Sequence, residues 1–210
     1  MVTITKIENQ KKNKERFNVF IDGQFACGIS GDTLIKFGLS ANDKITDETL
    51  NEIKNFDEYL YSKKISFDFL SYRIRSEKEI RDKLKLKEIS PGTIERTVEH
   101  LKELKLLDDE EFAKQLVREK LSSKPVGKAV LKQKLYQKGI PADITERILE
   151  ESFNDTNEKE FVKEIFNKYF NRVKGLDIMK QRKKMFDYLA RKGFDFELIK
   201  EVINENIQSQ

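Results

Sequence analysis

The chain repeats one apolar pattern three times, and this repetition constrains its fold more than any other feature. Residues 128–148 provide the template, with apolar side chains at helical spacing on both sides of the turn Lys138-Gly139-Ile140. The pattern recurs 51 residues earlier, with one residue inserted, and 54 residues later. The aligned apolar positions are Ile80, Leu84, Ile89, Ile94 and Val98, then Leu131, Leu135, Ile140, Ile144 and Ile148, then Met185, Leu189, Phe194, Leu198 and Val202. A fixed period in this range indicates an array of stacked helical units.

The period also predicts what each unit contains. Three helices of about 12 residues with short connections fill about 50 residues, whereas two-helix repeats need about 34. We therefore expect three-helix repeats at residues 58–107, 108–153 and 154–210, after a small β-rich domain with short helices at residues 1–57. The predicted fold class is mainly α, a curved elongated array of three tandem three-helix repeats preceded by a small antiparallel β (α+β) domain. Because a unit of about 50 residues buries only about 60% of its unfolded surface, neighbouring repeats are expected to share cores.

The first 30 residues alternate apolar and polar side chains, as strands do. Residues 17–21 lead into the hairpin signal Asp22-Gly23, after which the alternation resumes. Together with a strand near residues 2–7, they predict a three-stranded antiparallel meander. The last strand is expected to point three side chains inward, namely Phe25, Cys27 and Ile29.

Polar residues before the apolar stripes predict where helices begin. Ser76 and Glu79 have the spacing of a capping box, and Pro91 after Ser90 suits a first helical position. We also expect a helix around residues 50–56 that is separate from the first helix of the array, and a loop at residues 122–127. The other expected N-caps are Asp32 for a short helix ended by Gly38, Asp108 with Glu111 in the second repeat, and Asp195 for the last helix.

The net charge of +4 conceals three basic clusters. Residues 73–87 contain 7 basic and 3 acidic residues, residues 114–138 contain 8 and 1, and residues 168–192 contain 9 and 2. Each cluster covers the middle helix of one repeat, and charges interact locally because salt screens them over about 8–10 Å. One cluster alone is explained by a solvated helix face, but regular stacking would join all three into a surface for phosphates or for an acidic protein groove.

This charge pattern selects the candidate contact residues. They are Arg73, Arg75, Lys78, Arg81, Lys124, Lys128, Lys132, Lys134, Arg182, Lys183, Lys184 and Arg191. The aromatic residues among them, Tyr72, Tyr136 and Phe186, are expected in the core or at its boundary rather than as platforms for base stacking.

The sequence offers little for catalysis. It contains no P-loop, no dinucleotide-binding glycine pattern and no Cys/His set with metal-ligand spacing. The single histidine, His100, is expected to be partly exposed, and Cys27 to be a small buried apolar residue. We therefore predict no catalytic residue, no metal site and no cofactor, and hence a protein that is not an enzyme. One cysteine, no apolar run of 18 residues and a first segment without a secretory apolar region predict a cytoplasmic protein.

Several motifs resemble those of the bacterial RecX family of RecA regulators. They are LSYRIRSEKEIRDKL at residues 70–84, LKLLDDEEFAK at residues 104–114, and the turns Lys138-Gly139-Ile140 and Lys192-Gly193-Phe194. The resemblance covers residues 58–206 in order, and the β-rich beginning is similar to an extension that some members carry. The matching motif positions are Arg73, Arg75, Ser76, Glu77, Lys78, Glu79 and Arg81, and Leu107, Asp108, Asp109, Phe112 and Ala113.

This resemblance implies a regulator without catalytic residues. Its partner would be the RecA nucleoprotein filament, whose groove it would occupy while inhibiting strand exchange, ATPase and coprotease activities. It would act as a monomer with weak direct binding to single- or double-stranded DNA and no membrane association. Two alternatives stay open: a tandem helix-turn-helix protein that acts on duplex DNA directly, because three-helix units with a basic middle helix suit groove binding, and an inert structural adaptor.

Overall fold

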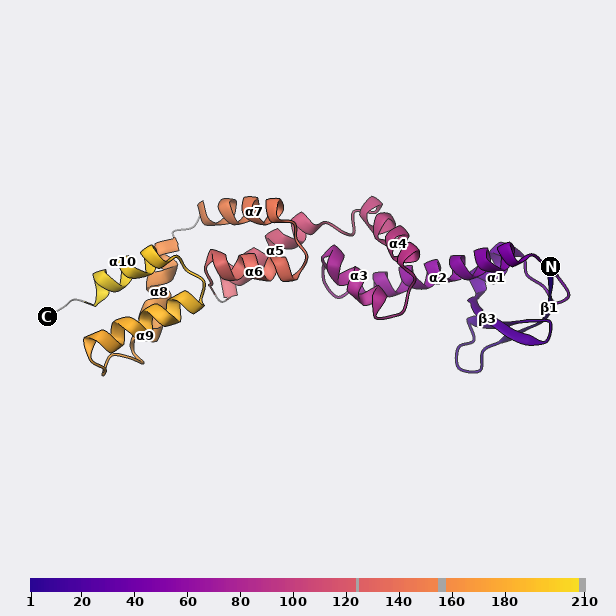
Figure 1. Cartoon of the computed structure of the whole chain (residues 1–210), viewed down its shortest axis with the longest axis horizontal. Helices are drawn as coiled ribbons and strands as arrows, with labels where there is room; N and C mark the ends of the chain where they lie inside the picture. The colour runs from indigo at the N-terminus through magenta and orange to yellow at the C-terminus, as the bar shows by residue number, and fades with distance from the viewer. Residues whose placement is uncertain (124, 155–157, 208–210) are drawn as a thin grey trace. The chain divides into compact units, whose positions relative to one another are not determined.

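The chain is mainly helical, with a small antiparallel sheet followed by three tandem three-helix units (Figure 1). The computed structural model describes residues 1–123, 125–154 and 158–207. Two compact units are present: residues 1–74 with 80–106, and residues 75–79 with 107–210. The predicted fold class is confirmed in these terms, while the curvature of the array stays a prediction.

The sheet of the first unit has the strand order β3-β2-β1-β4. The predicted antiparallel meander is confirmed as β1 (Val2–Asn9), β2 (Arg16–Ile21) and β3 (Gln24–Ser30). A fourth strand, β4 (Lys44–Ile45), pairs antiparallel with the start of β1. Two residues are too few to show an alternating pattern, so the sequence contained no signal for this strand.

An irregularity between β2 and β3 overturns one predicted orientation. Val19 pairs with Cys27, but the next residue, Phe20, pairs with Phe25, so the register shifts by one. An extra residue in one strand reverses the face to which later side chains point. Phe25 is therefore 60% exposed and contacts the Phe20 ring edge-on, and the prediction that it faces inward is wrong. Ile29 is buried, as expected for the inner face, whereas Cys27, which was expected to be buried, is only half-buried.

The short helix α1 (Gly31–Phe37) begins two residues earlier than predicted. The hydroxyl of Ser30 accepts a hydrogen bond from the Thr33 amide, so Ser30 is the N-cap and the prediction of Asp32 is wrong. Ser30 still has extended backbone angles, which an N-cap requires, whereas Asp32 already lies in the first turn. Gly38 ends the helix with a φ of 58°, as predicted.

The two helices expected around residues 50–70 are one helix, α2 (Asp47–Leu70). No proline or glycine interrupts this segment, so nothing stops helix propagation. The domain boundary placed between residues 57 and 58 falls inside α2, and the four-domain division otherwise stays a prediction.

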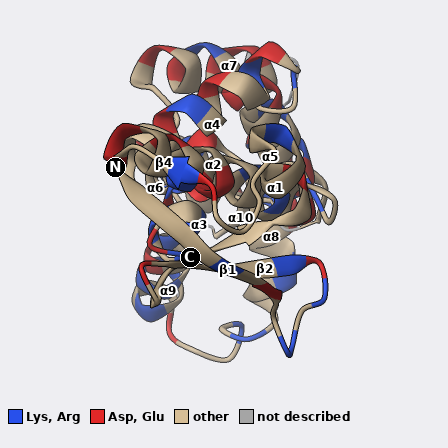
Figure 2. Cartoon of the chain, turned by 90° about the vertical axis from the view of Figure 1, so that its right-hand side faces the viewer, with Lys and Arg blue, Asp and Glu red and all other residues tan. Residues whose placement is uncertain are grey.

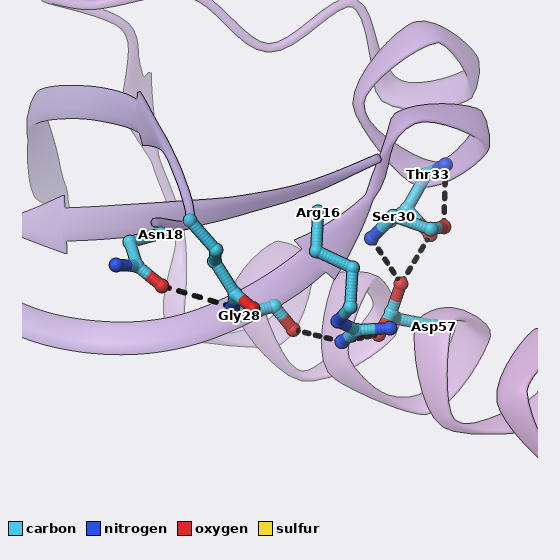
Figure 3. A network of polar contacts seen from close by, with 7 residues as sticks. Arg16, Asn18, Gly28, Ser30, Thr33 and Asp57 are labelled. Carbon is cyan, nitrogen blue, oxygen red and sulfur yellow. Dashed lines mark hydrogen bonds and ion pairs between the residues drawn. The ribbon is translucent and has the colours of Figure 1, made fainter. Parts of the chain in front are cut away.

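Asp57 lies on α2 and fastens the helix to the sheet. It is only 5% exposed and accepts hydrogen bonds from the Ser30 amide at 2.6 Å and the Thr33 hydroxyl at 2.9 Å (Figure 3). The Arg16 guanidinium donates to its other oxygen at 2.7 Å and to the Gly28 carbonyl at 2.8 Å. A buried carboxylate needs such partners, because an unpaired charge is costly to remove from water.

The other helices form the three repeats. Their bounds are α3 (Glu77–Lys85), α4 (Pro91–Glu103), α5 (Asp109–Ser123), α6 (Lys128–Gln137), α7 (Ala142–Asn154), α8 (Glu158–Phe170), α9 (Ile178–Arg191) and α10 (Phe196–Asn206). The capping box is confirmed by reciprocal hydrogen bonds of 3.3 Å between Ser76 and Glu79. The predicted caps Ser90 and Asp195 are also found. Helix α5 continues through Ser123, so the predicted loop begins two residues too early.

Most of the aligned apolar positions lie in the cores, but the residue inserted in the alignment of the first and second repeats is wrong, because buried Ile94 and Val98 match buried Thr145 and Leu149 at an uninterrupted shift of 51. Leu131, Leu135, Met185 and Leu189 are fully buried, whereas Ile144 is only half-buried. The buried residues of the second and third repeats form two separate clusters. The expectation of shared cores is therefore wrong for these two repeats, because each encloses its own apolar side chains between its three helices.

Neighbouring repeats are instead joined through a glycine turn. The Gly127 amide donates to the Lys192 carbonyl at 2.9 Å, and the Ala129 amide donates to the Gly193 carbonyl at 3.2 Å. The first amides of a helix have no partner within that helix, and here the turn after α9 supplies carbonyls to the start of α6. Gly127 has no capping side chain, since a Cβ there would lie 2.1 Å from the Gly193 oxygen.

A similar contact occurs at residues 75–79, which pack with the second repeat in the second unit. Gly139 has a φ of 78°, and a Cβ added there would lie 2.7 Å from the Cβ of Lys78. The Lys138 ammonium donates to Glu79 of the capping box at 2.6 Å. The turn after the middle helix of one repeat therefore meets the start of the preceding middle helix at both junctions.

The Asp57 network predicts a measurable loss on neutralisation. Asp57→Asn removes the charge that Arg16 and two hydroxyl or amide donors face, so the free energy of unfolding should fall by about 1.5–3 kcal/mol, as for hydrogen bonds to charged groups. Urea unfolding measures this change. Asp68→Asn, at an exposed position of the same helix, is the control and should change stability by less than about 0.5 kcal/mol. Equal effects of the two variants would contradict the role of Asp57.

The glycine turn predicts that alanine destabilises the protein at one glycine and not at another. Gly193 has a φ of 82°, and a Cβ there would lie 2.6 Å from the Val130 nitrogen. Gly193→Ala should therefore lower the free energy of unfolding by about 2–3 kcal/mol, from left-handed strain and overpacking together. Gly175→Ala is the matched control, because that position has open space and no positive φ. A Gly193 variant as stable as the Gly175 variant in urea unfolding would contradict the junction.

Candidate functional site

The twelve candidate basic residues differ in what their side chains do. Basic and acidic positions are spread over the helices (Figure 2), whereas α9 contains five Lys or Arg residues and one Asp. Lys124 lies outside the described residues. Several of the remaining eleven make ion pairs or hydrogen bonds within their own repeat, and the others are described by how far they are exposed to solvent.

Two candidates form equivalent ion pairs. Arg81 on α3 pairs with Glu95 on α4 at 2.8 Å, and Lys132 on α6 pairs with Glu146 on α7 at 2.9 Å. The two pairs coincide under the 51-residue shift. In both repeats an ion pair therefore connects the middle helix with the third helix. Charge clustering in the sequence could not distinguish such a paired residue from one that contacts a partner.

Three other candidates donate to backbone carbonyls. Arg182 donates to the Ile207 carbonyl at 2.7 Å and to the Asn204 side chain, so it closes the end of α10. Such orphan carbonyls at a helix end need donors. Within their own segments, Arg191 donates to the Asp187 carbonyl at 3.1 Å and Arg73 to the Ile74 carbonyl at 2.8 Å.

The second unit also presents four lysine candidates, of which three are exposed and one is half-buried. Lys128 on α6 is exposed with its ammonium 5.2 Å from the Phe153 ring centroid, and Lys134 is half-buried. Lys183 and Lys184 are consecutive exposed residues of α9. These four residues, which we call the exposed lysine set, lie on middle helices of successive repeats. Contact with a partner through them stays a prediction.

Residues 75–79 contribute two further candidates to the second unit. Arg75 is half-buried and Lys78 is exposed. The base of the Lys78 side chain packs at the Gly139 turn, so this residue has a structural contact as well as a charge near solvent.

Two aromatic residues contradict the sequence-based expectation. Tyr72 is 84% exposed and Tyr136 is 80% exposed, so neither is a core or boundary residue. Tyr136 follows the buried Leu135, and one residue turns a helix by about 100°, which carries its side chain off the apolar stripe. That spacing was the signal that could have found it. Phe186 is half-buried against Phe196, with ring centroids 5.6 Å apart, in agreement with the prediction.

Glu110 is a charge centre that sequence reasoning treated only as part of a helix start. It accepts from the Arg147 guanidinium at 2.9 and 2.7 Å and from the Lys114 ammonium at 2.7 Å. These hydrogen bonds lower the pKa of Glu110 from 4.5 to about 2. Lys114, the first residue of the second basic cluster, is thus neutralised within its repeat. Asp108 behaves as predicted and accepts from the Glu110 and Glu111 amides.

His100, the single histidine of the chain, packs beside an aromatic ring and a carboxylate. The His100 ring lies 6.2 Å from the Tyr59 ring and 3.8 Å from a Glu103 oxygen, with 31% of its side chain exposed. Over residues 1–123, 125–154 and 158–207, no group of three His, Cys, Asp or Glu side chains is placed to hold a metal ion. Within the same ranges, none of the helices has the length and apolar character needed to cross a membrane.

Four family models match the chain in sequence order. They are described as the Regulatory protein RecX N-terminal domain, at residues 2–46, and the first, second and third three-helix domains of RecX, at residues 63–101, 108–149 and 162–203. The chain belongs to the RecX family. It is therefore a member of a family of regulatory proteins, and the predicted resemblance is confirmed.

Relatives and solved structures agree with this assignment. Regulatory protein RecX of Staphylococcus aureus strain Newman is 38% identical over 205 residues, covering 98% of this chain and 75% of the relative, and that of strain JH9 is 37% identical. A crystal structure of regulatory protein RecX matches with a TM-score of 0.71 and 27% identity over 100% of both chains. RecX from Lactobacillus salivarius matches with a TM-score of 0.65 and 28% identity, covering 71% of this chain and 96% of the other.

The Glu110 pKa predicts how acid affects the second repeat. A carboxylate whose folded pKa is lowered stabilises the fold above its unfolded pKa and loses this effect as pH falls through the folded value. Wild type should therefore be more stable than Glu110→Gln at pH 7, and the difference should shrink between about pH 4.5 and pH 2. Urea unfolding at a series of pH values measures this. Glu111→Gln, at an exposed position of the same turn, is the control, and a pH-independent Glu110 effect would contradict the prediction.

Proposed function

We propose that this protein binds the RecA–DNA filament and limits recombinase, ATPase and coprotease activities by occupying the filament groove. Membership of a regulatory family supports the general role. The observation that carries the specific proposal is the exposed lysine set on the middle helices of successive repeats, because positive charge on both of these helices suits a groove that contains DNA phosphates.

The proposed mechanism is competitive occupation. The exposed lysine set contacts the anionic groove, while Arg81, Lys132 and Arg182 bridge helices within their own repeats. A protein seated in this way bridges adjacent RecA protomers and denies the groove to a second DNA or to a protein substrate. Exposed charges are screened by salt, so inhibition should weaken as ionic strength rises.

The RecA–DNA filament as partner also suggests the oligomeric state, the location and the DNA affinity of the protein. The protein acts as a monomer, because each molecule supplies its own repeats to the filament. It acts in the cytoplasm, where a RecA–DNA filament forms, and it binds DNA alone only weakly, because four lysines make few phosphate contacts.

RecA-promoted strand exchange tests the proposal. Wild type at stoichiometric coverage should inhibit exchange and filament ATPase. Reversing all four charges of the exposed lysine set to Glu should raise the half-inhibitory concentration by at least about tenfold, since several phosphate contacts are lost together. The matched control reverses four exposed lysines of the β-rich segment, Lys11, Lys12, Lys14 and Lys44.

The outcomes separate the hypotheses. No effect of wild type at stoichiometric coverage would sink the proposal and would leave the inert adaptor open, whereas equal inhibition by the reversed and wild-type proteins would place the contact on another surface. A control variant that loses inhibition equally would place the contact outside the exposed lysine set.

A second candidate function is direct DNA binding by tandem helix-turn-helix units. The exposed Tyr136 beside Lys132 and Lys134 favours it, since an exposed aromatic ring among basic residues can contact a nucleic acid. This hypothesis predicts tight, sequence-dependent duplex binding without RecA, whereas the filament regulator binds DNA alone weakly and with strong salt dependence. Gel shifts over a range of salt concentrations distinguish the two.

A further inference from the structure

The third repeat departs from the other two at the ion pair between its middle and last helices. The pairs Arg81–Glu95 and Lys132–Glu146 occupy aligned positions. Shifted by 54 residues, Lys132 and Glu146 correspond to Phe186 and Lys200. The third repeat therefore has an aromatic ring where the others have a cation, and a cation where the others have a carboxylate.

A pocket lies at this substituted position, between α9 and α10. Its volume is about 370 Å³, and it is lined by Met179, Arg182, Lys183, Phe186, Lys200, Ile203 and Asn204. Every charged residue of this lining is a cation. Met179 is 77% exposed, which leaves an apolar side chain beside the cationic ones in contact with solvent.

The cations of the pocket differ in how firmly they are held. Arg182 is fixed by its hydrogen bonds to the end of α10, so its charge stays beside the pocket. Lys200 pairs with Glu197 at 2.7 Å on the exposed side of α10. Lys183 is exposed and reaches the pocket from α9. A ligand carboxylate can therefore meet the fixed cation Arg182 and the exposed cation Lys183, and preorganisation reduces the entropy lost on binding.

We propose that this pocket docks an acidic peptide segment of a partner protein through one large apolar anchor residue. Charge complementarity selects the flanking acidic residues, because the pocket lining contains cations and no carboxylate. The apolar side chains of Met179, Phe186 and Ile203 select the anchor, since filling such a pocket with an apolar side chain dominates the affinity of short segments. The volume lies at the low end for ligand sites, which suits one side chain and not a folded surface.

This inference goes beyond the proposed filament function and does not rest on it. The pocket belongs to one repeat, and the peptide that tests it, described below, is measured without RecA and without DNA. A failure of peptide binding therefore leaves the strand-exchange result unaffected, and a failure of strand-exchange inhibition leaves peptide binding unaffected.

Fluorescence anisotropy with the full chain tests the proposal. The probe is a fluorescein-labelled heptapeptide with one central phenylalanine and three acidic residues on each side. Met179→Ser and Lys183→Glu should each weaken its binding by about fivefold or more, because they remove an anchor contact and a cation. Lys184→Glu is the matched control, since it reverses an adjacent exposed charge outside the pocket lining and should change affinity by less than about twofold.

A second peptide tests the anchor. Replacing the central phenylalanine by serine keeps the net charge of the peptide and should weaken its binding by about tenfold. A tenfold loss corresponds to about 1.4 kcal/mol of binding free energy, as expected for an anchor side chain. Both protein variants alter exposed side chains, and their unfolding in urea should match wild type.

Four results would overturn the proposal. The first is absence of binding at about 1 mM protein, the weakest affinity that a specific site is expected to have. The second is equal weakening by the Lys183 and Lys184 variants, which would indicate diffuse charge attraction. The third is equal binding of the phenylalanine and serine peptides. The fourth concerns a single-stranded oligonucleotide with the same net charge as the peptide. If it binds more tightly than the peptide and Met179→Ser weakens that binding, the pocket would be assigned to nucleic acid.

Discussion

The repeats of the second unit depend on one backbone contact, in which a helix start is completed by the turn of the next repeat. The free amides at the start of α6 donate to carbonyls at the end of α9, so two helix ends that lack internal partners satisfy each other. The negative end of one helix dipole also meets the positive end of another. This contact needs glycine at residues 127 and 193, because a Cβ at either would collide with the opposing backbone. The junction is therefore specified by the absence of side chains.

This way of joining repeats explains why their middle helices can carry many cations. Since the cores of the second and third repeats are separate, a middle helix buries only the stripe that faces its own repeat. Leu131 and Leu135 fill that stripe on α6, whereas Lys128 and Tyr136 are exposed. An array built from shared cores would have buried a wider face of each helix and left fewer positions for charge. The same architecture allows one repeat to change its surface alone, as the third repeat does at Phe186 and Lys200.

The candidate site was predictable in outline but not in its members. Charge clustering located the middle helices correctly, because lysine and arginine are excluded from cores unless they are paired. It could not show that Lys132, although exposed, pairs with Glu146. The partner of Lys132 is 14 residues away on another helix, and only the packing of the two helices brings them together. The pocket of the third repeat was missed for the same reason, since its side chains come from two helices.

By itself the sequence determined the number of repeats, most helix starts and the buried stripes, because these depend on apolar spacing and on capping residues close in the chain. Tertiary structure alone decided the exposed face of Phe25, through a register shift, and the continuity of α2 across residue 57. It also decided that Gly127 and Gly193 join two repeats. These outcomes arise from contacts between segments that are distant in the sequence, and a local sequence pattern does not predict such contacts. The motif Lys-Gly-aromatic or Lys-Gly-Ile was visible as a turn, but its second role required the neighbouring repeat.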